Sequence, residues 1–206
     1  MKVIRLLMVS IFIFSNLFGQ DKKQKLYVFV GEKIEVKEFK PKVKEGTILM
    51  DQAFKAKYKI LKNVYGDLKQ DSIEFVAYDH YGIPPFSKHK YVLLYIVKEG
   101  ENLYHSKYQF SALYKTKENK WAGIYSKYDY GHSFNKNTSI KPEKINFEPI
   151  VEIDLKESSK ETISKWYPKP YFYIKDNKAI AVYGNYINEL FQLKKDGVLK
   201  ARGYFK

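Results

Sequence analysis

The sequence contains no cysteine among its 206 residues. A chain without cysteine forms no disulfide bonds, binds no zinc through thiolates and carries no lipid on an N-terminal cysteine. The fold must therefore be held together by a buried core alone. A chain of this length can bury about two-thirds of the surface that it exposes when unfolded, so a core of that kind is within reach.

Arginine is almost as scarce, although 37 Lys and Arg residues outnumber 23 Asp and Glu residues. Only Arg5 and Arg202 are arginines. Arginine is the preferred residue for bidentate contacts to phosphate and guanine, so the composition argues against a dedicated reader of nucleic acid. The formal charge of +14 indicates attraction to anionic partners such as acidic polysaccharide or lipid headgroups. A lysine-rich surface that keeps the protein soluble explains the same charge.

Long apolar runs are absent except at the start, where Leu6–Phe14 is nearly unbroken. Lys2 and Arg5 precede this run, and Gly19-Gln20 follow it before a lysine-rich segment. This pattern predicts a signal peptide at 1–19, and the run is too short to span a bilayer. We therefore expect a soluble protein exported to the periplasm or outside the cell, without a transmembrane segment in the remaining chain. Without Lys2 and Arg5, 35 basic residues face 23 acidic residues, a balance of +12.

Alternating and apolar segments predict a mainly β fold, an antiparallel small barrel (OB-like) or a sandwich, at 20–124. In 54–60, every second residue is apolar and Lys55, Lys57 and Lys59 share the opposite face, which is typical of a half-buried strand. The segment 91–97 is apolar on both faces and predicts a strand covered on both sides. Further strands are expected at 26–30, 33–39, 72–78 and 103–108, with a hairpin formed by 111–115 and 121–124.

The second half predicts a loop or linker at 125–142 and a β-rich C-terminal subdomain at 143–206. Ser158 and Glu161 fit a capping box for one short helix that ends near Trp166. Turn residues Asp176-Asn177 and Asp196-Gly197 predict two hairpins, with strands at 171–174, 179–183, 190–193 and 198–201. A short helix at 186–195 is the alternative to the last hairpin.

The first half also resembles a known family. Val28-Phe29-Val30-Gly31, the segment from Phe54 to Asp67, and Tyr91-Val92-Leu93-Leu94-Tyr95 resemble the strand order of netrin-module and metalloproteinase-inhibitor-like OB domains over residues 26–98. The resemblance implies an OB-like barrel. It does not extend to inhibition, because those domains use an N-terminal cysteine that this chain lacks. The whole chain is also similar to exported proteins of unassigned function from Gram-negative bacteria, which implies location only.

Candidates for catalysis gather around Asp79-His80-Tyr81-Gly82, where a strand is expected to end. Asp79, His80 and a more distant His105 are the candidate acid and base groups of a hydrolase. A simple turn explains the same residues, because neighbours on a strand point to opposite faces. The four histidines lack the paired spacing of a zinc helix, so we predict no metal and no cofactor.

Aromatic residues, by contrast, are abundant, with 19 Tyr, 14 Phe and 2 Trp. Aromatic faces stack on sugars and bases, and nearby lysines attract anionic chains. The candidate ligand-binding residues are therefore Lys55, Lys57, Lys59, Tyr81, Tyr104, Tyr108 and Trp166, although packing on sheet faces explains many aromatics equally well. The leading hypothesis is a non-catalytic binding protein of the cell envelope whose ligand is a glycan, in particular an anionic one, or an envelope protein. The alternatives are a secreted hydrolase and a basic, inhibitor-like or stress-related envelope protein.

Overall fold

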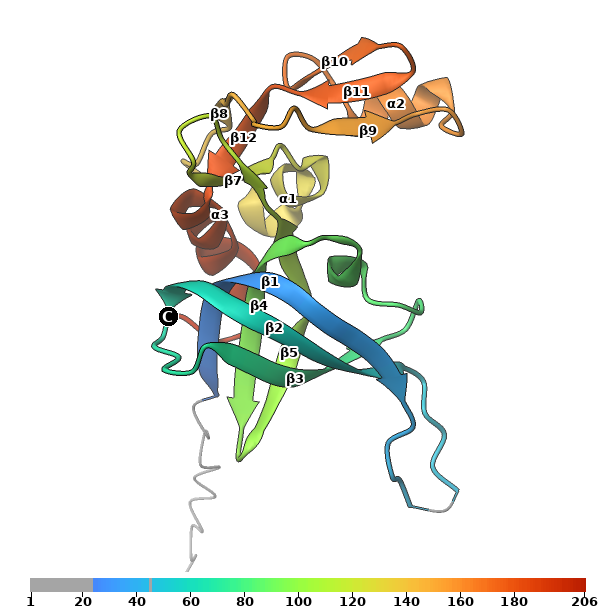
Figure 1. The fold of residues 1–206 in the computed structure, drawn as a ribbon, viewed down its shortest axis with the longest axis vertical. Helices are drawn as coiled ribbons and strands as arrows, with labels where there is room; N and C mark the ends of the chain where they lie inside the picture. The colour runs from blue at the N-terminus through green and yellow to red at the C-terminus, as the bar shows by residue number, and fades with distance from the viewer. Residues whose placement is uncertain (1–23, 45) are drawn as a thin grey trace, which may run out of the picture.

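The first half of the chain forms a closed barrel (Figure 1). In this computed structural model, which describes residues 24–44 and 46–206, the strand order is β1-β2-β3-β5-β4, and β1 also pairs with β4. Neighbouring strands are antiparallel except β3 and β5, which run parallel where Val76 pairs with Tyr104. The strands are β1 (Lys25–Phe39), β2 (Gln52–Tyr65), β3 (Ser72–Asp79), β4 (Tyr91–Glu99) and β5 (Asn102–Ala112). The mainly β prediction is confirmed, with a barrel as its form; the predicted signal peptide lies outside the described residues.

Strand β4 is buried on both faces, as its apolar sequence predicts. One face points into the barrel beside Phe29 and Tyr58 and consists of Val92, Leu94 and Ile96. The other face, Leu93, Tyr95 and Val97, contributes to a second buried cluster outside the barrel wall. Strand β1 is divided in the same way, so these two neighbouring strands join the barrel interior to an outer layer.

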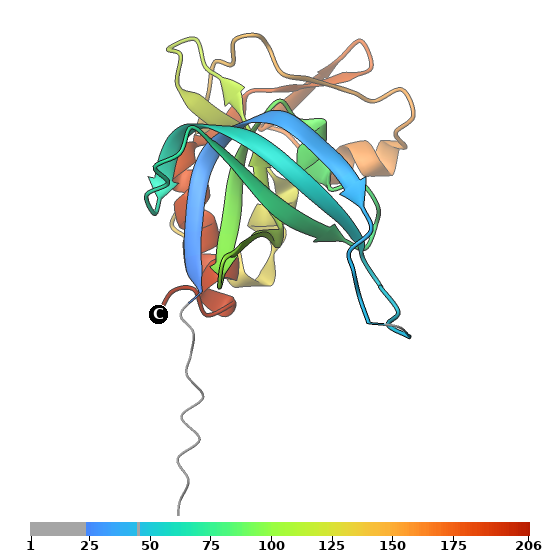
Figure 2. The same cartoon turned by 60° about the horizontal axis from the view of Figure 1, so that its bottom comes forward.

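The C-terminal half adds two small sheets above the barrel (Figure 2). One has the order β6-β7-β12-β8 and the other β10-β11-β9. Their strands are β6 (Tyr114–Lys115), β7 (Trp121–Ile124), β8 (Glu143–Lys144), β9 (Glu152–Asp154), β10 (Phe172–Lys175), β11 (Lys178–Ala181) and β12 (Tyr183–Tyr186). The predicted hairpin at Asp176-Asn177 is confirmed, because both residues have the positive φ, 49° and 56°, that a type I′ turn requires.

The predicted hairpin at 190–201 is wrong, and the alternative helix is correct. Helix α3 spans Ile187–Lys194 and continues into a π-helical segment, η3 (Lys195–Leu199). Glu189 accepts a hydrogen bond from the Tyr186 backbone N–H at 3.1 Å, which caps the helix start. Gly197 does not form a hairpin turn. It allows the backbone to pass close to the Asn135 side chain, because a Cβ at position 197 would lie 2.1 Å from Asn135 Oδ1.

The segment 125–142, predicted as a loop or linker, contains helix α1 (Lys127–Gly131) and a 3-10 turn, η2 (Ser133–Asn135). Helix α1 could not be predicted from the sequence, because five residues are too few to show a helical period. It is stabilised by its N-cap, where the Ser126 hydroxyl oxygen accepts a hydrogen bond from the Asp129 backbone N–H at 3.1 Å. Helix α2 (Lys160–Trp166) is capped by Ser159, one residue after the predicted Ser158. Residues 143–206 therefore hold two α-helices where one was predicted.

Helix α3 packs against the outer face of β1 and β4 (Figure 1). Ile187, Leu190 and Leu199 join the buried cluster of Leu93, Tyr95 and Val97. This contact returns the end of the chain to the barrel and brings Lys194 and Arg202 to the same strand, β5. None of the helices at residues 24–44 and 46–206 is long and apolar enough to cross a membrane.

Candidate ligand-binding groove

A groove of about 960 Å³ runs between the barrel and the C-terminal half. One wall comes from β5 and from the short 3-10 helix η1 (Pro85–Lys88), which follows β3. The opposite wall comes from α1, α2 and the strands β9 and β10. Concave sites with mostly apolar walls and a few polar groups are the usual form of ligand sites, so this groove is the principal candidate.

An extended bulge in β5 shapes the barrel side of this groove. Leu94 pairs with Phe110 and Ile96 pairs with His105, so that Tyr95 of β4 faces the segment 106–109. Tyr108 within the bulge has a φ of 66°, which is rare for a residue with a side chain. Bulges re-aim side chains, and this one presents Tyr108 to the groove while Gln109 turns inward.

Four exposed aromatic side chains line the groove from four separate segments. Tyr81 follows β3 and is 86% exposed, whereas Trp166 at the end of α2 is 37% exposed. Tyr108 and Tyr128 complete the set, from β5 and α1 respectively. The Tyr81 and Tyr108 rings lie with centroids 6.3 Å apart on the barrel side. The fold thus gathers Tyr81, Tyr108 and Trp166, three of the predicted ligand-binding residues, around one groove.

His105 lines the groove with its ring packed against Phe86, at a centroid distance of 4.6 Å. Its Nε2 lies 2.8 Å from the Gln109 carbonyl oxygen, across the bulge. The pKa of His105 is lowered to about 4, mainly by burial; the Gln109 contact opposes this shift, and the charge of Arg202 adds to it. The His105 ring is therefore uncharged at neutral pH, and its contact with the Gln109 carbonyl oxygen stabilises the bulge.

We expect the low pKa of His105 to make the protein less stable in mild acid. Because the folded pKa lies below the ordinary value of 6.5, the stabilising effect is complete above pH 6.5 and is lost as pH falls toward 4. The loss is about 3 kcal/mol, since each pKa unit corresponds to about 1.4 kcal/mol. Urea unfolding at about pH 7.5 and about pH 4 measures it, with His105→Gln as the comparison. An equal pH dependence in the wild type and the variant would contradict this prediction.

The other two candidate catalytic residues have separate partners. Asp79 is buried and accepts a hydrogen bond from the Tyr81 backbone N–H at 2.9 Å. This contact is the one expected if Asp79 serves a turn. His80 Nδ1 lies 2.8 Å from the Met50 carbonyl oxygen and 3.6 Å from Asp51 Oδ1. Asp79 and His105 both line the groove, but within the described residues no hydrogen bond joins either of them to His80.

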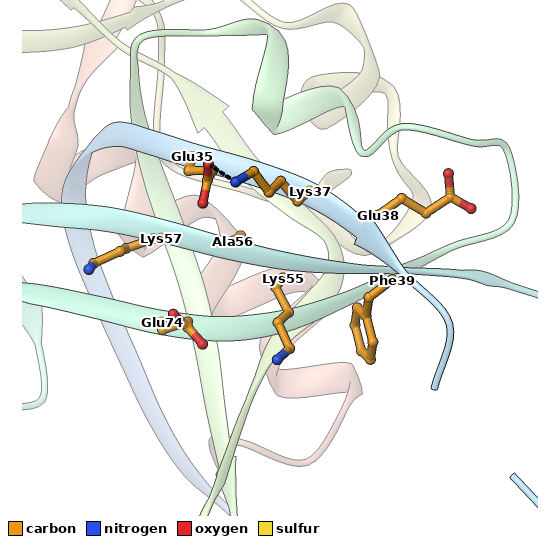
Figure 3. A pocket seen from close by; sticks show the side chains of 8 residues that line it. All are labelled: Glu35, Lys37, Glu38, Phe39, Lys55, Ala56, Lys57 and Glu74. Carbon is orange, nitrogen blue, oxygen red and sulfur yellow. Dashed lines mark ion pairs between the residues drawn. The ribbon is translucent and has the colours of Figure 1, made fainter. Parts of the chain in front are cut away.

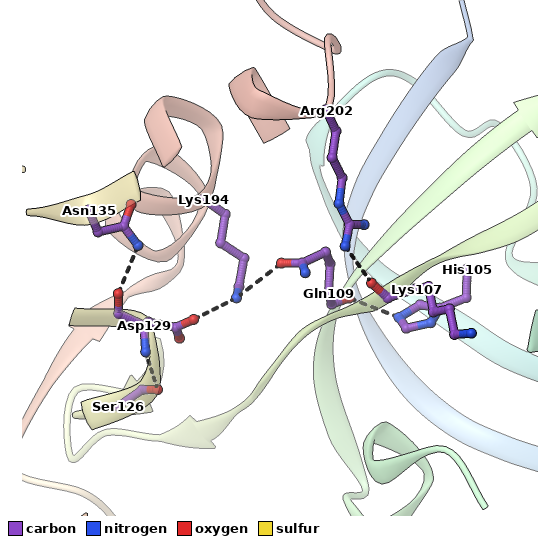
Figure 4. Close-up of polar contacts among 8 residues, drawn as sticks. All are labelled: His105, Lys107, Gln109, Ser126, Asp129, Asn135, Lys194 and Arg202. Atoms are coloured by element: carbon purple, nitrogen blue, oxygen red, sulfur yellow. Dashed lines mark hydrogen bonds and ion pairs between the residues drawn. The ribbon is translucent and has the colours of Figure 1, made fainter. Parts of the chain in front are cut away.

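A polar network at the wall of the groove could not be predicted from the sequence (Figure 4). Lys194 of α3 is 5% exposed and donates to Asp129 Oδ1 at 2.9 Å, with Gln109 Oε1 at 3.5 Å. Arg202 donates to Ser106 Oγ and to the Lys107 carbonyl oxygen, both at 3.0 Å. The bulge is thereby held at both ends by residues that lie 85 to 96 positions away in sequence. No local pattern could have signalled these contacts.

The three candidate lysines of β2, Lys55, Lys57 and Lys59, are exposed on the outer surface of the barrel. Figure 3 shows the first two of them. As predicted, Phe54, Ala56 and Tyr58 are buried and the lysines point outward. In the strand register, Lys57 lies opposite Glu35 of β1 and Glu74 of β3. The Lys55 Nζ lies 5.5 Å from the Phe39 ring centroid. Lys55 and Lys57 line a shallow hollow of about 290 Å³ whose charges are mixed. An exposed aromatic cluster beside these lysines, the arrangement that would favour an anionic glycan, is not found among the residues lining that hollow.

Tyr104, the remaining candidate, packs against Tyr78 with ring centroids 6.3 Å apart. It is partly buried, and it is not among the residues that line the groove. Across residues 24–44 and 46–206, no group of three His, Asp or Glu side chains is placed to hold a metal ion.

Comparison with protein-family models, curated proteins and solved structures found no match for this chain. A proposal about function therefore rests on the residues of the groove itself.

Proposed function

We propose that this chain is an exported, non-catalytic protein of the cell envelope that binds an anionic glycan chain in the groove. The observation that carries the proposal is the convergence of Tyr81, Tyr108, Tyr128 and Trp166 on one concave surface. Large aromatic side chains left exposed together cost the protein solubility, and a ligand that covers them with its own flat faces removes that cost. Sugar rings present such faces.

The charges of the groove support an anionic ligand. Lys88 and Lys127 are exposed along its walls. The two carboxylates in the lining are already engaged, Asp79 by a backbone N–H and Asp129 by Lys194. Lys194 balances the charge of Asp129, and Asp79 is buried, so the exposed charges of the lining are the ammonium groups of Lys88 and Lys127. This favours uronate or other acidic sugars over neutral ones.

Two further parts of the proposal rest on the sequence and the barrel. Export is supported by the pattern of residues 1–19, a basic start followed by a short apolar run. An OB-like classification is supported by five strands in the order β1-β2-β3-β5-β4 with β3 parallel to β5. OB folds include binders of oligosaccharides, so the proposed ligand class is one that such a barrel can serve.

The test is affinity electrophoresis in gels that contain polygalacturonate or alginate, with neutral dextran as the reference. We expect retardation by the acidic polymers alone, weakened by salt because exposed charge contacts are screened. Trp166→Ala and Tyr81→Ala, from opposite walls, should each weaken binding roughly 5- to 150-fold, since stacking on one aromatic ring is worth about 1–3 kcal/mol.

Tyr173→Ala is the matched control, because Tyr173 on β10 is 42% exposed but does not line the groove. Its binding should equal that of the wild type. Retardation that is equal for all three variants would place the ligand elsewhere. Failure of every polysaccharide to bind would favour the envelope-protein ligand instead.

A further inference from the structure

The loop between β1 and β2, residues 40–51, has an unusual composition for a turn. Val43, Ile48, Leu49 and Met50 are all exposed, Ile48 to 83% and Met50 to 72%. Connections between strands are normally built from Gly, Asn, Asp, Ser and Pro. Two other hairpins of this protein have such residues at their turns, Gly100 in one and Asp176-Asn177 in the other. The apolar side chains of loop 40–51 therefore need an explanation.

The geometry of the loop places these side chains away from the body of the protein. The Thr47 N–H donates to the Lys44 carbonyl oxygen at 3.1 Å, so the chain reverses near residues 44–47. Val43 and Ile48 stand on either side of this reversal. Figures 1 and 2 show the loop projecting beyond the end of the barrel, and Figure 1 shows it at the opposite end from the β9–β11 sheet. The exposed apolar side chains are thus carried on a segment that projects from the described part of the barrel.

The base of the loop is fixed, and its charges are those of a cationic element. Lys40, Lys42 and Lys44 are exposed beside the apolar residues. The loop sequence also contains Glu45 and Asp51, and Asp51 is paired with Lys107 at 2.6 Å. The His80 contact to the Met50 carbonyl oxygen holds the same end. Lysines next to exposed apolar side chains match the layered chemistry of an anionic bilayer, with charged headgroups above an apolar interior.

We propose that residues 40–44 and 46–50 dock this protein on an anionic lipid surface. Val43 and Ile48 enter the boundary between headgroups and acyl chains, and Lys42 and Lys44 contact lipid phosphates. This role is separate from the groove, which lies between the barrel and the C-terminal half. A glycan and a lipid surface can therefore be bound by one molecule at the same time.

The absence of cysteine makes a local test straightforward. An Ile48→Cys variant of the full chain carries one environment-sensitive fluorophore, whose emission reports the surroundings of residue 48 itself. Vesicles of phosphatidylglycerol and phosphatidylcholine should shift its emission to the blue and protect it from an aqueous quencher. Vesicles of phosphatidylcholine alone should not. Adding Lys42→Gln and Lys44→Gln should reduce vesicle affinity at least about tenfold, because each lysine near an anionic surface contributes about 1 kcal/mol.

Ile174→Cys is the matched control, because Ile174 on β10 is exposed and apolar but distant from the loop. Its label should keep an aqueous spectrum with either vesicle. An unshifted label at position 48 would overturn the proposal, as would equal shifts with neutral and anionic vesicles. A shift that appears without vesicles and grows with protein concentration would show that a second copy of the chain covers the loop, and would also overturn it.

Discussion

Replacing Asp129 with alanine is expected to lower the free energy of unfolding by about 3–5 kcal/mol, because it leaves Lys194 charged and buried without its partner. The substitution also removes the only carboxylate within 4 Å of the Lys194 ammonium among the described residues. Urea denaturation followed by circular dichroism measures the effect. The Asp129 carboxylate also acts on Tyr95. The pKa of the Tyr95 hydroxyl is raised mainly by burial, and the negative charge of Asp129 makes a smaller contribution in the same direction.

A double-mutant cycle separates the loss of the pair from the loss of packing. Lys194→Met keeps most of the length of the side chain and removes its charge. Asp129→Ala combined with Lys194→Met should therefore cost far less than the two single substitutions together. Additive losses would show that the two side chains act independently, contrary to the contact at 2.9 Å.

Gly184→Ala is expected to destabilise the C-terminal half by about 3 kcal/mol or more, as severe overpacking does. A Cβ at this position would lie 2.0 Å from the Gly123 carbonyl oxygen and 3.2 Å from the Phe147 ring. Gly184 sits in β12 between β7 and β8, so the strands of the sheet would have to separate. Thermal unfolding and near-ultraviolet circular dichroism report the loss.

Gly131→Ala is the control for this substitution. Gly131 ends α1, has no heavy atom within 4 Å of an added Cβ, and is not among the glycines with positive φ. Its stability should stay within about 0.5 kcal/mol of the wild type, as for most surface positions. Equal stability of the two alanine variants would mean that β7 and β12 approach each other less closely than described.

Strands whose residues all obey one period could be predicted from the sequence. In β2 the alternation of Phe54, Ala56 and Tyr58 with lysines arises because one face of the barrel wall is buried and the other is exposed to solvent. In β4 the unbroken apolar run follows from burial on both faces. Helix α3 was harder, because Asp196-Gly197 gives a strong local hairpin signal while the helical face is decided by contact with a barrel more than 80 residues earlier.

The groove was only partly predictable for the same reason. Tyr81, Tyr108 and Trp166 were chosen as exposed aromatic candidates, and the fold brings them to one surface. The spacing of Lys55 and Lys57 predicts an exposed basic face, but the fold places this face on the outer wall of the barrel. There Lys57 lies in register with Glu35 and Glu74, and neither lysine lines the groove. Tyr128 is not among the candidate ligand-binding residues predicted from the sequence, because its segment was predicted to be a loop or linker. The structure places it in helix α1, on the opposite wall of the groove.

The sequence by itself determined the absence of disulfides, the basic surface, the mainly β fold and most of the barrel strands. These properties depend on composition and on periods of two residues, which the order of residues displays directly. Only the tertiary structure decided the barrel closure, the helical end of the chain, the bulge of β5 and the gathering of aromatic side chains around one groove. Each of these depends on contacts between residues far apart in the chain, such as Lys194 with Asp129 and Arg202 with Ser106, whose free energy is gained only when the packed layers meet.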